Sequence, residues 1–234
     1  MCLREVNDMG TSAAATDKNK AAQPGTSYLS TLILSILAGM SIGIGGCLFL
    51  AIENKVIGSL FFTLGLFTIC TRGFYLFTGK VGYVFDNPPS YIIDLVIIWV
   101  GNLIGTNIDS FLISLTRIGA AFTEKAAGIS GTKLNDGILS VFVLGIFCNI
   151  LMYIAVDGFK KNPHDFGKYV GLFLCVAGFI LAGFEHCVAN MFYFGMAGAW
   201  SVHSFIWLIV MTLGNVVGGI LIPLFTKASE ACSQ

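Results

Sequence analysis

The stretch that decides the fold is Gly183-Phe184-Glu185-His186-Cys187-Val188-Ala189, which places a glutamate and a histidine inside the long apolar run 169–199. Ionisable groups deep in a membrane are costly, and where they occur they face an internal cavity. The stretch therefore predicts a membrane-spanning helix that breaks near the midplane and directs His186 into a polar path.

A similar stretch, Gly73-Phe74-Tyr75-Leu76-Phe77-Thr78-Gly79, lies 110 positions earlier (183 against 73). A second pair of similar stretches lies 113 positions apart: Gly101-Asn102-Leu103-Ile104-Gly105 and Gly214-Asn215-Val216-Val217-Gly218. Each half then holds three crossings, an odd number, so the two halves must be inverted across the membrane. Inverted repeats with interrupted helices in matching positions indicate a binding path at the midplane.

Six apolar runs organise the chain, at residues 29–52, 56–84, 91–115, 138–156, 169–199 and 201–225. About 20 apolar residues span a bilayer as a helix, so the two runs of about 30 residues, the second and the fifth, are the ones expected to be broken. We therefore predict an all-α integral membrane protein with repeat halves at 29–115 and 138–225. The six-span transport domain covers 29–226, between a disordered cytoplasmic tail at 1–28 and a short cytoplasmic tail at 227–234.

The composition excludes several classes of protein. Hydrophobic residues make up 56% of the chain and charged residues 11%, against about 25% charged residues in a soluble domain. The net charge of zero, with no basic stripe, argues against a nucleic-acid partner. The seven cysteines lie in apolar runs or tails without zinc-type spacing, which favours packing roles, so no metal or cofactor is expected.

Positive charge orients the six spans. The side with both termini would hold eight basic residues and the other side four, which places the termini in the cytoplasm and the protein in the plasma or inner membrane. The eight are Arg4, Lys18, Lys20, Lys80, Lys160, Lys161, Lys168 and Lys227, and the four are Lys55, Arg117, Lys125 and Lys133.

Several polar residues are candidates for the pore and its supports. Non-helical backbone at membrane depth must be satisfied or face a pore, so the amides at the breaks, with Thr78 and His186, are possible donors to an anion. Asn149, Asn190 and Arg72 lie near the breaks and could bind the freed backbone groups, and Glu185 could tie its broken helix to a neighbouring helix or subunit.

Together these motifs resemble the formate/nitrite transporter family. The matching stretches run in the family's order from about residue 30 to 225: Leu37-Ala38-Gly39-Met40-Ser41-Ile42-Gly43, Leu76-Phe77-Thr78-Gly79, Gly101-Asn102, Leu144-Gly145-Ile146-Phe147-Cys148-Asn149, Gly183-Phe184-Glu185-His186-Cys187-Val188-Ala189-Asn190-Met191 and Gly214-Asn215-Val216-Val217-Gly218-Gly219. The resemblance implies an aquaporin-like fold and a homopentamer with one pore per protomer. The family's solutes are formate, nitrite, hydrosulfide and, in some members, acetate or lactate.

The resemblance also assigns residues. The family's pore histidine corresponds to His186, its midplane threonine to Thr78 and its vestibule lysine to Lys133. Its apolar constrictions fall near Phe62, Leu66, Leu76, Phe77 and Phe179. Two features depart from the best-known formate channels. The loop 191–201 is short, and Leu76-Phe77-Thr78-Gly79-Lys80 is closer to the subgroup that includes hydrosulfide channels.

The expected substrate is a small monovalent anion that moves with a proton. A bare anion in an apolar constriction meets a solvation penalty that reaches tens of kcal/mol in the ideal limit, so it takes up a proton instead. His186 would relay that proton or act as a hydrogen-bonding station. Two alternatives stay open. A neutral-solute channel of the aquaporin or ammonia type lacks support because no Asn-Pro-Ala box occurs, and a membrane enzyme using His186 and Glu185 lacks a zinc or nucleophile motif.

Overall fold

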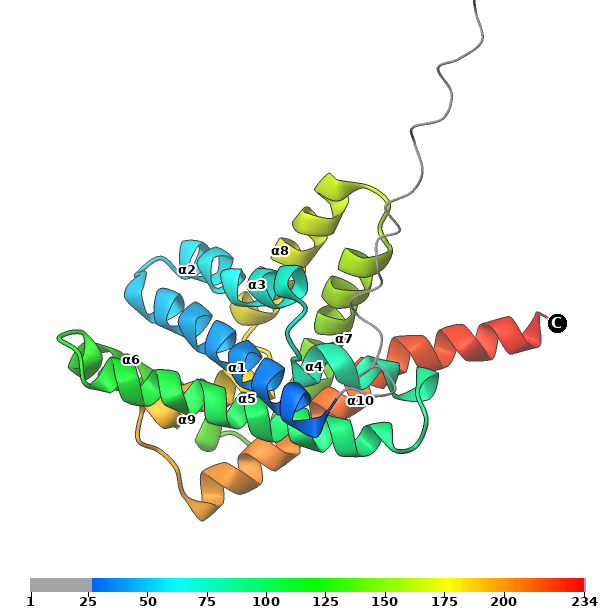
Figure 1. Ribbon diagram of the computed structural model, residues 1–234. Helices are drawn as coiled ribbons and strands as arrows, with labels where there is room; N and C mark the ends of the chain where they lie inside the picture. Colours follow the sequence, from blue (N-terminus) through cyan, green and yellow to red (C-terminus); the bar gives the residue numbers. More distant parts are fainter. Residues whose placement is uncertain (1–26, 234) are drawn as a thin grey trace, which may run out of the picture.

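The structure is a computed structural model that describes residues 27–233 of the 234. The predicted tail at 1–28 lies outside this range except for its last two residues. Helices account for most of the described chain (Figure 1). Five helical segments in that range are long and apolar enough to cross a membrane, and they are Tyr28–Ala51, Lys55–Arg72, Tyr91–Ser114, Ile138–Lys161 and Val202–Cys232.

The predicted six-span bundle, with its second and fifth spans broken, is the architecture found. The first half consists of α1 (Tyr28–Ala51), α2 (Lys55–Phe62), α3 (Leu64–Arg72), α4 (Phe77–Lys80), the 3-10 helix η1 (Val81–Asp86) and α5 (Tyr91–Ser114). The second half consists of α7 (Ile138–Lys161), α8 (Asp165–Leu181), α9 (Cys187–Met196) and α10 (Val202–Cys232). The second span is built from α2, α3 and α4, and the fifth from α8 and α9.

Glycines bring the helices of each half into backbone contact. A Cβ on Gly105 of α5 would collide with the carbonyl oxygen of Ile36 on α1, and a Cβ on Gly218 of α10 would collide with that of Ile146 on α7. Small residues allow such approach where lipid offers no hydrophobic drive between helices. The same contact in both halves, at offsets of 110 and 113, shows that the sequence repeat is a structural repeat.

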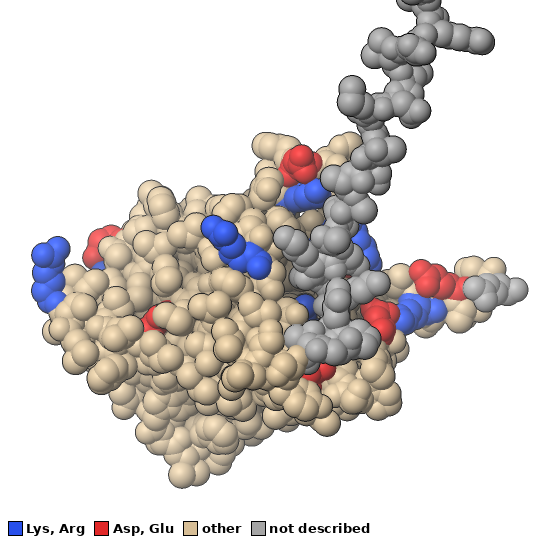
Figure 2. All heavy atoms as spheres, viewed as in Figure 1, with Lys and Arg blue, Asp and Glu red and all other residues tan. Residues whose placement is uncertain are grey.

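The surface is dominated by apolar side chains. In Figure 2 the visible face of the bundle is almost entirely free of charge, and the few charged groups lie mainly near its edges. Large hydrophobic residues are exposed along every long helix, including Leu29, Ile93, Phe111, Leu139 and Leu213. Such a surface is matched to lipid or to another apolar protein surface, in agreement with an integral membrane protein.

A helix between the two halves was not expected from the sequence. This helix, α6 (Gly119–Leu134), lies on the membrane side where α1 ends. Lys125 on α6 donates to the carbonyl oxygen of Leu50 at 2.9 Å and pairs with Glu53 at 3.0 Å. At the C-terminal end of α6, the Nε2 of His203 lies 2.9 Å from the carbonyl oxygen of Leu134. These bonds hold α6 against α1 and α10.

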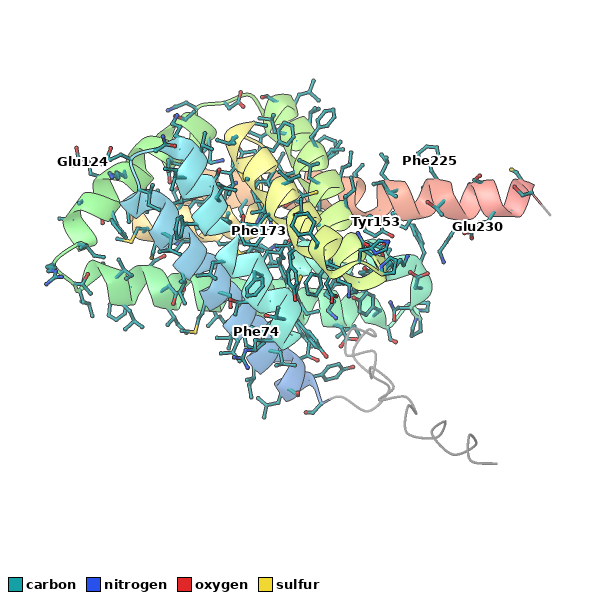
Figure 3. The ribbon with its side chains drawn as sticks, turned by 90° about the horizontal axis from the view of Figure 1, so that it is seen from above. Phe74, Glu124, Tyr153, Phe173, Phe225 and Glu230 are labelled. Atoms are coloured by element: carbon teal, nitrogen blue, oxygen red, sulfur yellow. The ribbon has the colours of Figure 1, made fainter. Side chains whose placement is uncertain are left out.

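The last helix is longer than a bilayer is thick. Its 31 residues span about 46 Å at 1.5 Å per residue, against roughly 30 Å for a hydrocarbon core. The helix continues to Cys232, so it includes most of the segment 227–234 that the sequence assigned to a tail. Phe225 and Glu230 lie on this projecting end, away from the bundle (Figures 1 and 3).

Candidate functional site

The two helix breaks have the same backbone geometry. Gly73 ends α3 with φ 72°, and Gly183 follows α8 with φ 73°. This left-handed region is unfavourable for residues with a Cβ, which explains glycine at both positions. The next N–H in each break, of Phe74 or Phe184, returns to a carbonyl oxygen of the preceding helix at 3.0 and 2.9 Å. In each break the chain then continues as an extended segment toward the middle of the bundle.

Asn102 on α5 satisfies the first break. Its Oδ1 accepts a hydrogen bond from the N–H of Phe77, the first residue of α4, at 2.9 Å. Its Nδ2 donates to the carbonyl oxygens of Ser35 at 2.8 Å and Tyr75 at 2.9 Å. The side-chain amide of Asn102 therefore binds the start of α4, the extended segment of the break and α1.

Asn215 on α10 does the same for the second break. Its Oδ1 accepts from the N–H of Cys187, the first residue of α9, at 2.9 Å. Its Nδ2 donates to the carbonyl oxygens of Gly145 and Glu185, both at 2.8 Å. The sequence drew attention to this asparagine only as part of a repeat. Its occurrence in both halves, buried at corresponding positions, was the signal that could have revealed its role.

The residues predicted to bind the freed backbone groups act less directly. Asn149 donates to the carbonyl oxygen of Asn215 at 2.7 Å, so it supports the second break through α10. Asn190 donates to the Glu185 carboxylate at 2.6 Å. Arg72 is exposed at the end of α3. Direct support comes instead from the two asparagines described above, because the rotation of each helix decides which buried amide faces a break.

Thr78 and His186 meet between the two breaks. The Thr78 hydroxyl oxygen lies 3.0 Å from the Nε2 of His186, and both side chains are buried. The backbone N–H of Ala189 donates to the Nδ1 of His186 at 3.1 Å, so this nitrogen carries no proton. Nε2–H is then the donor to Thr78, and the imidazole in this arrangement is neutral. The ring also stacks on Phe179, with centroids 5.4 Å apart and planes at 16°.

A cavity of about 600 Å³ lies on one side of this pair. It is on the membrane side where α1 ends, and we name it the distal cavity. Phe62, Phe179 and His186 form part of its lining, and α6 contributes Lys125, Gly128, Ile129, Thr132 and Lys133. The rings of Phe62 and Phe179 meet edge to face, with centroids 6.3 Å apart and planes at 87°.

Lys133 and Glu185 form an ion pair at the wall of the distal cavity. Their charged atoms are 2.6 Å apart, and their side chains are 14% and 4% exposed. Buried charges are tolerated when they are paired and hydrogen-bonded, and Asn190 supplies the further bond to Glu185. Lys133 also lines the distal cavity. Through this pair Glu185 connects its broken span to α6.

A second cavity opens on the membrane side where α1 begins and α10 ends, and we name it the terminal cavity. Its lining includes Leu66, Leu76, Lys80 and Lys160. The four apolar residues Phe62, Leu66, Leu76 and Phe179 thus line one cavity or the other, on either side of the Thr78–His186 pair. Phe77, which the resemblance placed among the constrictions, lines neither cavity. The sequence did not assign a site role to Lys80 or Lys160.

Comparison with known proteins agrees with the fold. A family model described as "Formate/nitrite transporter" matches residues 7–228. The uncharacterized transporter YrhG of Bacillus subtilis is 28% identical over 244 residues, covering 94% of this chain and 90% of the relative. A probable formate transporter of Methanothermobacter thermautotrophicus is 28% identical over 229 residues, covering 80% and 84%. A solved pentameric formate channel with formate bound matches with a TM-score of 0.74 at 28% identity, covering 91% of this chain and all of that one.

Proposed function

Since the chain belongs to the formate/nitrite transporter family, we propose that each copy forms a pore for a small monovalent anion of a weak acid: formate, nitrite or hydrosulfide. The observation that carries the proposal is the Thr78–His186 pair, which lies between two cavities at the meeting point of two broken helices. A homopentamer is the proposed assembly, because the solved formate channel that the chain resembles is pentameric.

The proposed path runs from the distal cavity to the terminal cavity. It passes Lys133 and Glu185, then Phe62 and Phe179, and reaches His186 and Thr78. Leu66 and Leu76 follow at the terminal cavity. Polar groups therefore occur at the mouths and at the midplane, and apolar side chains fill the two intervals.

This alternation favours transport of the neutral acid across the apolar intervals. Small carboxylic acids titrate near the Asp value of about 3.9, so the solute approaches as an anion, which the lysine-bearing mouths attract. Removal of water favours the protonated form. Solute and proton thus cross together.

His186 is proposed as a hydrogen-bonding station. Its Nδ1 accepts from the N–H of Ala189, so a second ring proton would break a bond that holds the start of α9. Its Nε2–H donates to Thr78, whose hydroxyl proton can then turn toward an oxygen of the solute. The pair offers the passing acid a donor without a change in charge.

The protein is proposed to lie in the plasma or inner membrane with both termini in the cytoplasm. The excess of Lys and Arg on the terminal side, eight against four, supports this orientation. The distal cavity would then face the outside of the cell, where an anion would first meet the wall formed by α6.

A solute panel tests the proposed function. The purified chain is reconstituted in liposomes, and the fluxes of formate, nitrite, hydrosulfide and glycerol are measured with and without a pH gradient. We expect at least one of the three weak-acid anions to cross faster than in empty liposomes, and faster still down an inward proton gradient. Flux of glycerol alone would instead support a neutral-solute channel and would overturn the proposal.

A further inference from the structure

The distal cavity is much larger than the solutes proposed for the path. Its volume is about 600 Å³, whereas a single water molecule needs about 10–15 Å³ of such space. Formate, nitrite and hydrosulfide are not much larger than water. Pockets that hold organic ligands have volumes of about 300–1,000 Å³, so the distal cavity has the capacity for an organic molecule.

The wall of the distal cavity is mainly apolar. Aromatic rings and aliphatic side chains line it from α1, α2, α6, α8 and the break that follows α8, among them Phe49, Phe62, Ile129, Phe179, Ile180 and Phe184. A small hydrated anion gains little from such a wall, whereas an apolar molecular body is favourably removed from water against it. Pockets for organic ligands combine such a wall with a few polar groups that fix the orientation of the ligand.

The charged groups of the distal cavity leave one ammonium group in excess. Three lysines and two glutamates line the cavity. Lys125 pairs with Glu53 at 3.0 Å, and Lys133 pairs with Glu185 at 2.6 Å. The third lysine, Lys55, is exposed at the start of α2, and its side chain forms no ion pair or hydrogen bond with any residue between 27 and 233. An anionic group can therefore approach Lys55 without displacing either pair.

Tyr193 supplies a hydroxyl group to the same cavity. It lines the cavity together with Ala189, one turn earlier on α9, and His186. Tyr193 lies about two turns after His186, or about 10 Å along the helix axis toward the distal side. It is 6% exposed, yet its hydroxyl forms no hydrogen bond with any residue in the described range. Buried hydroxyl groups are as a rule hydrogen-bonded, so this one is available to a ligand in the cavity.

We propose that the distal cavity binds an organic monocarboxylate with an apolar body, of which an aromatic acid is the simplest case, and that this ligand blocks the path. The inference rests on the proposed function, in which the distal cavity is one end of the path. The carboxylate of the ligand accepts a hydrogen bond from the hydroxyl of Tyr193 and lies near the ammonium group of Lys55. Such a bond is strong because its acceptor is charged. The apolar body packs against the rings of Phe62 and Phe179.

The rest of the path is too narrow for such a ligand. The rings of Phe62 and Phe179 are in edge-to-face contact, with centroids 6.3 Å apart, so a third ring does not fit between them. The terminal cavity has a volume of only about 20 Å³, which is enough for about one water molecule. An aromatic acid therefore enters the distal cavity and stays there, where it excludes the small anion.

Inhibition of formate influx tests this inference. The full chain is reconstituted in liposomes at neutral pH, and formate influx is measured with increasing benzoate or with benzamide, its uncharged analogue. The variants are Tyr193→Phe and Lys55→Met. Tyr153→Phe and Arg117→Met are the matched controls, since Tyr153 is a buried tyrosine and Arg117 an exposed basic residue, and neither lines the distal or the terminal cavity.

We expect benzoate to inhibit formate influx at a concentration about tenfold or more below that of benzamide. Tyr193→Phe should raise the half-inhibiting benzoate concentration about tenfold, the scale of one lost hydrogen bond to a charged group. Lys55→Met should raise it about threefold, because an exposed charge contributes less. Each value is referred to the uninhibited flux of the same variant, and the two controls should give the wild-type value. Lys55 is exposed, so Lys55→Met reports even if Tyr193→Phe does not fold.

Thermal unfolding in detergent gives a second readout that does not depend on transport. Benzoate should raise the unfolding temperature of the wild type, and the rise should be smaller in Tyr193→Phe. Formate transport that benzoate and benzamide inhibit equally, or benzoate inhibition unchanged in both variants, would overturn the site and leave the proposed function intact. Faster entry of benzoate than in empty liposomes would overturn the block. Absence of formate, nitrite and hydrosulfide transport, with benzoate still raising the unfolding temperature, would overturn the proposed function and the block but keep the site.

Discussion

The Nε2 of His186 lies 3.0 Å from the hydroxyl oxygen of Thr78, although 108 residues separate them along the chain. Each residue belongs to a different broken span, and each is brought to the middle of the bundle by a glycine with φ near 72°. The contact therefore depends on both halves of the repeat. It connects the fold to the proposed function.

Replacement of Thr78 by Val should slow formate flux about tenfold and destabilise the fold by about 1–3 kcal/mol, because the buried Nε2–H of His186 loses its acceptor. Valine keeps the shape of threonine but removes the hydroxyl that lies against His186. His186→Asn should also reduce flux, while its side-chain oxygen can still cap α9 in place of Nδ1. The measurement is formate flux in liposomes over a range of pH. Unchanged flux and pH dependence in both variants would remove the pair from the mechanism.

Loss of either break-supporting asparagine should destabilise the fold. Asn102→Ala and Asn215→Ala each remove three buried hydrogen bonds, which we expect to cost about 2–4 kcal/mol. Thermal unfolding in detergent measures the change. Asn135→Ala is the control, since its side-chain bond to Gly131 is exposed on α6. Equal unfolding temperatures for Asn102→Ala and Asn135→Ala would contradict this role.

A glycine pair separates the effect of backbone conformation from that of packing. No atom lies within 4 Å of a Cβ built on Gly183 or on Gly171. Gly183 has φ 73°, whereas Gly171 is inside α8. Gly183→Ala should therefore destabilise by about 1 kcal/mol, and Gly171→Ala should stabilise by roughly 0.5–1 kcal/mol. Chemical denaturation in detergent should show opposite signs, and a shared sign would argue against a strained break.

Lys133 and Glu185 should contribute to the free energy of unfolding as a pair and not independently. Lys133→Met leaves the Glu185 carboxylate buried beside Asn190 without its cation, which we expect to cost about 3 kcal/mol. The double variant Lys133→Met with Glu185→Gln should recover most of that loss, since no unpaired charge remains. A double-mutant cycle on unfolding free energies measures the coupling. Additive losses would show that the pair contributes nothing as a pair.

Much of the fold was predictable because membrane spans can be recognised in a sequence by their length and their apolar composition. The breaks were also predictable, since a glycine-bearing stretch recurs at an offset of 110 in the two longest apolar runs, and the second of these runs also contains His186. The helix α6 was missed because its residues, rich in Gly, Ala, Thr and Lys, lack an apolar stripe. Its stability depends on tertiary bonds such as those of Lys125 and His203.

The site was predicted less completely than the fold. His186, Thr78 and Lys133 were expected at the path. The structure brings His186 against Thr78 and has His186 and Lys133 line the distal cavity, and their part in transport stays a prediction. Asn149 and Asn190 were predicted to support the breaks, and their hydrogen bonds reach the second break through Asn215 and Glu185. A sequence does not tell which buried amide faces a break. Phe77 was expected at a constriction and instead lines neither cavity, since its position is set by the start of α4.

Coupled movement of formate and a proton can be measured in a single assay. Wild-type protein is reconstituted in liposomes that enclose a fluorescent pH indicator, a formate gradient is imposed at neutral pH, and empty liposomes are the control. We expect formate influx to acidify the lumen faster than in empty liposomes, with about one proton for each formate, and Thr78→Val to slow both equally. Rapid formate influx without acidification of the lumen would contradict this coupling.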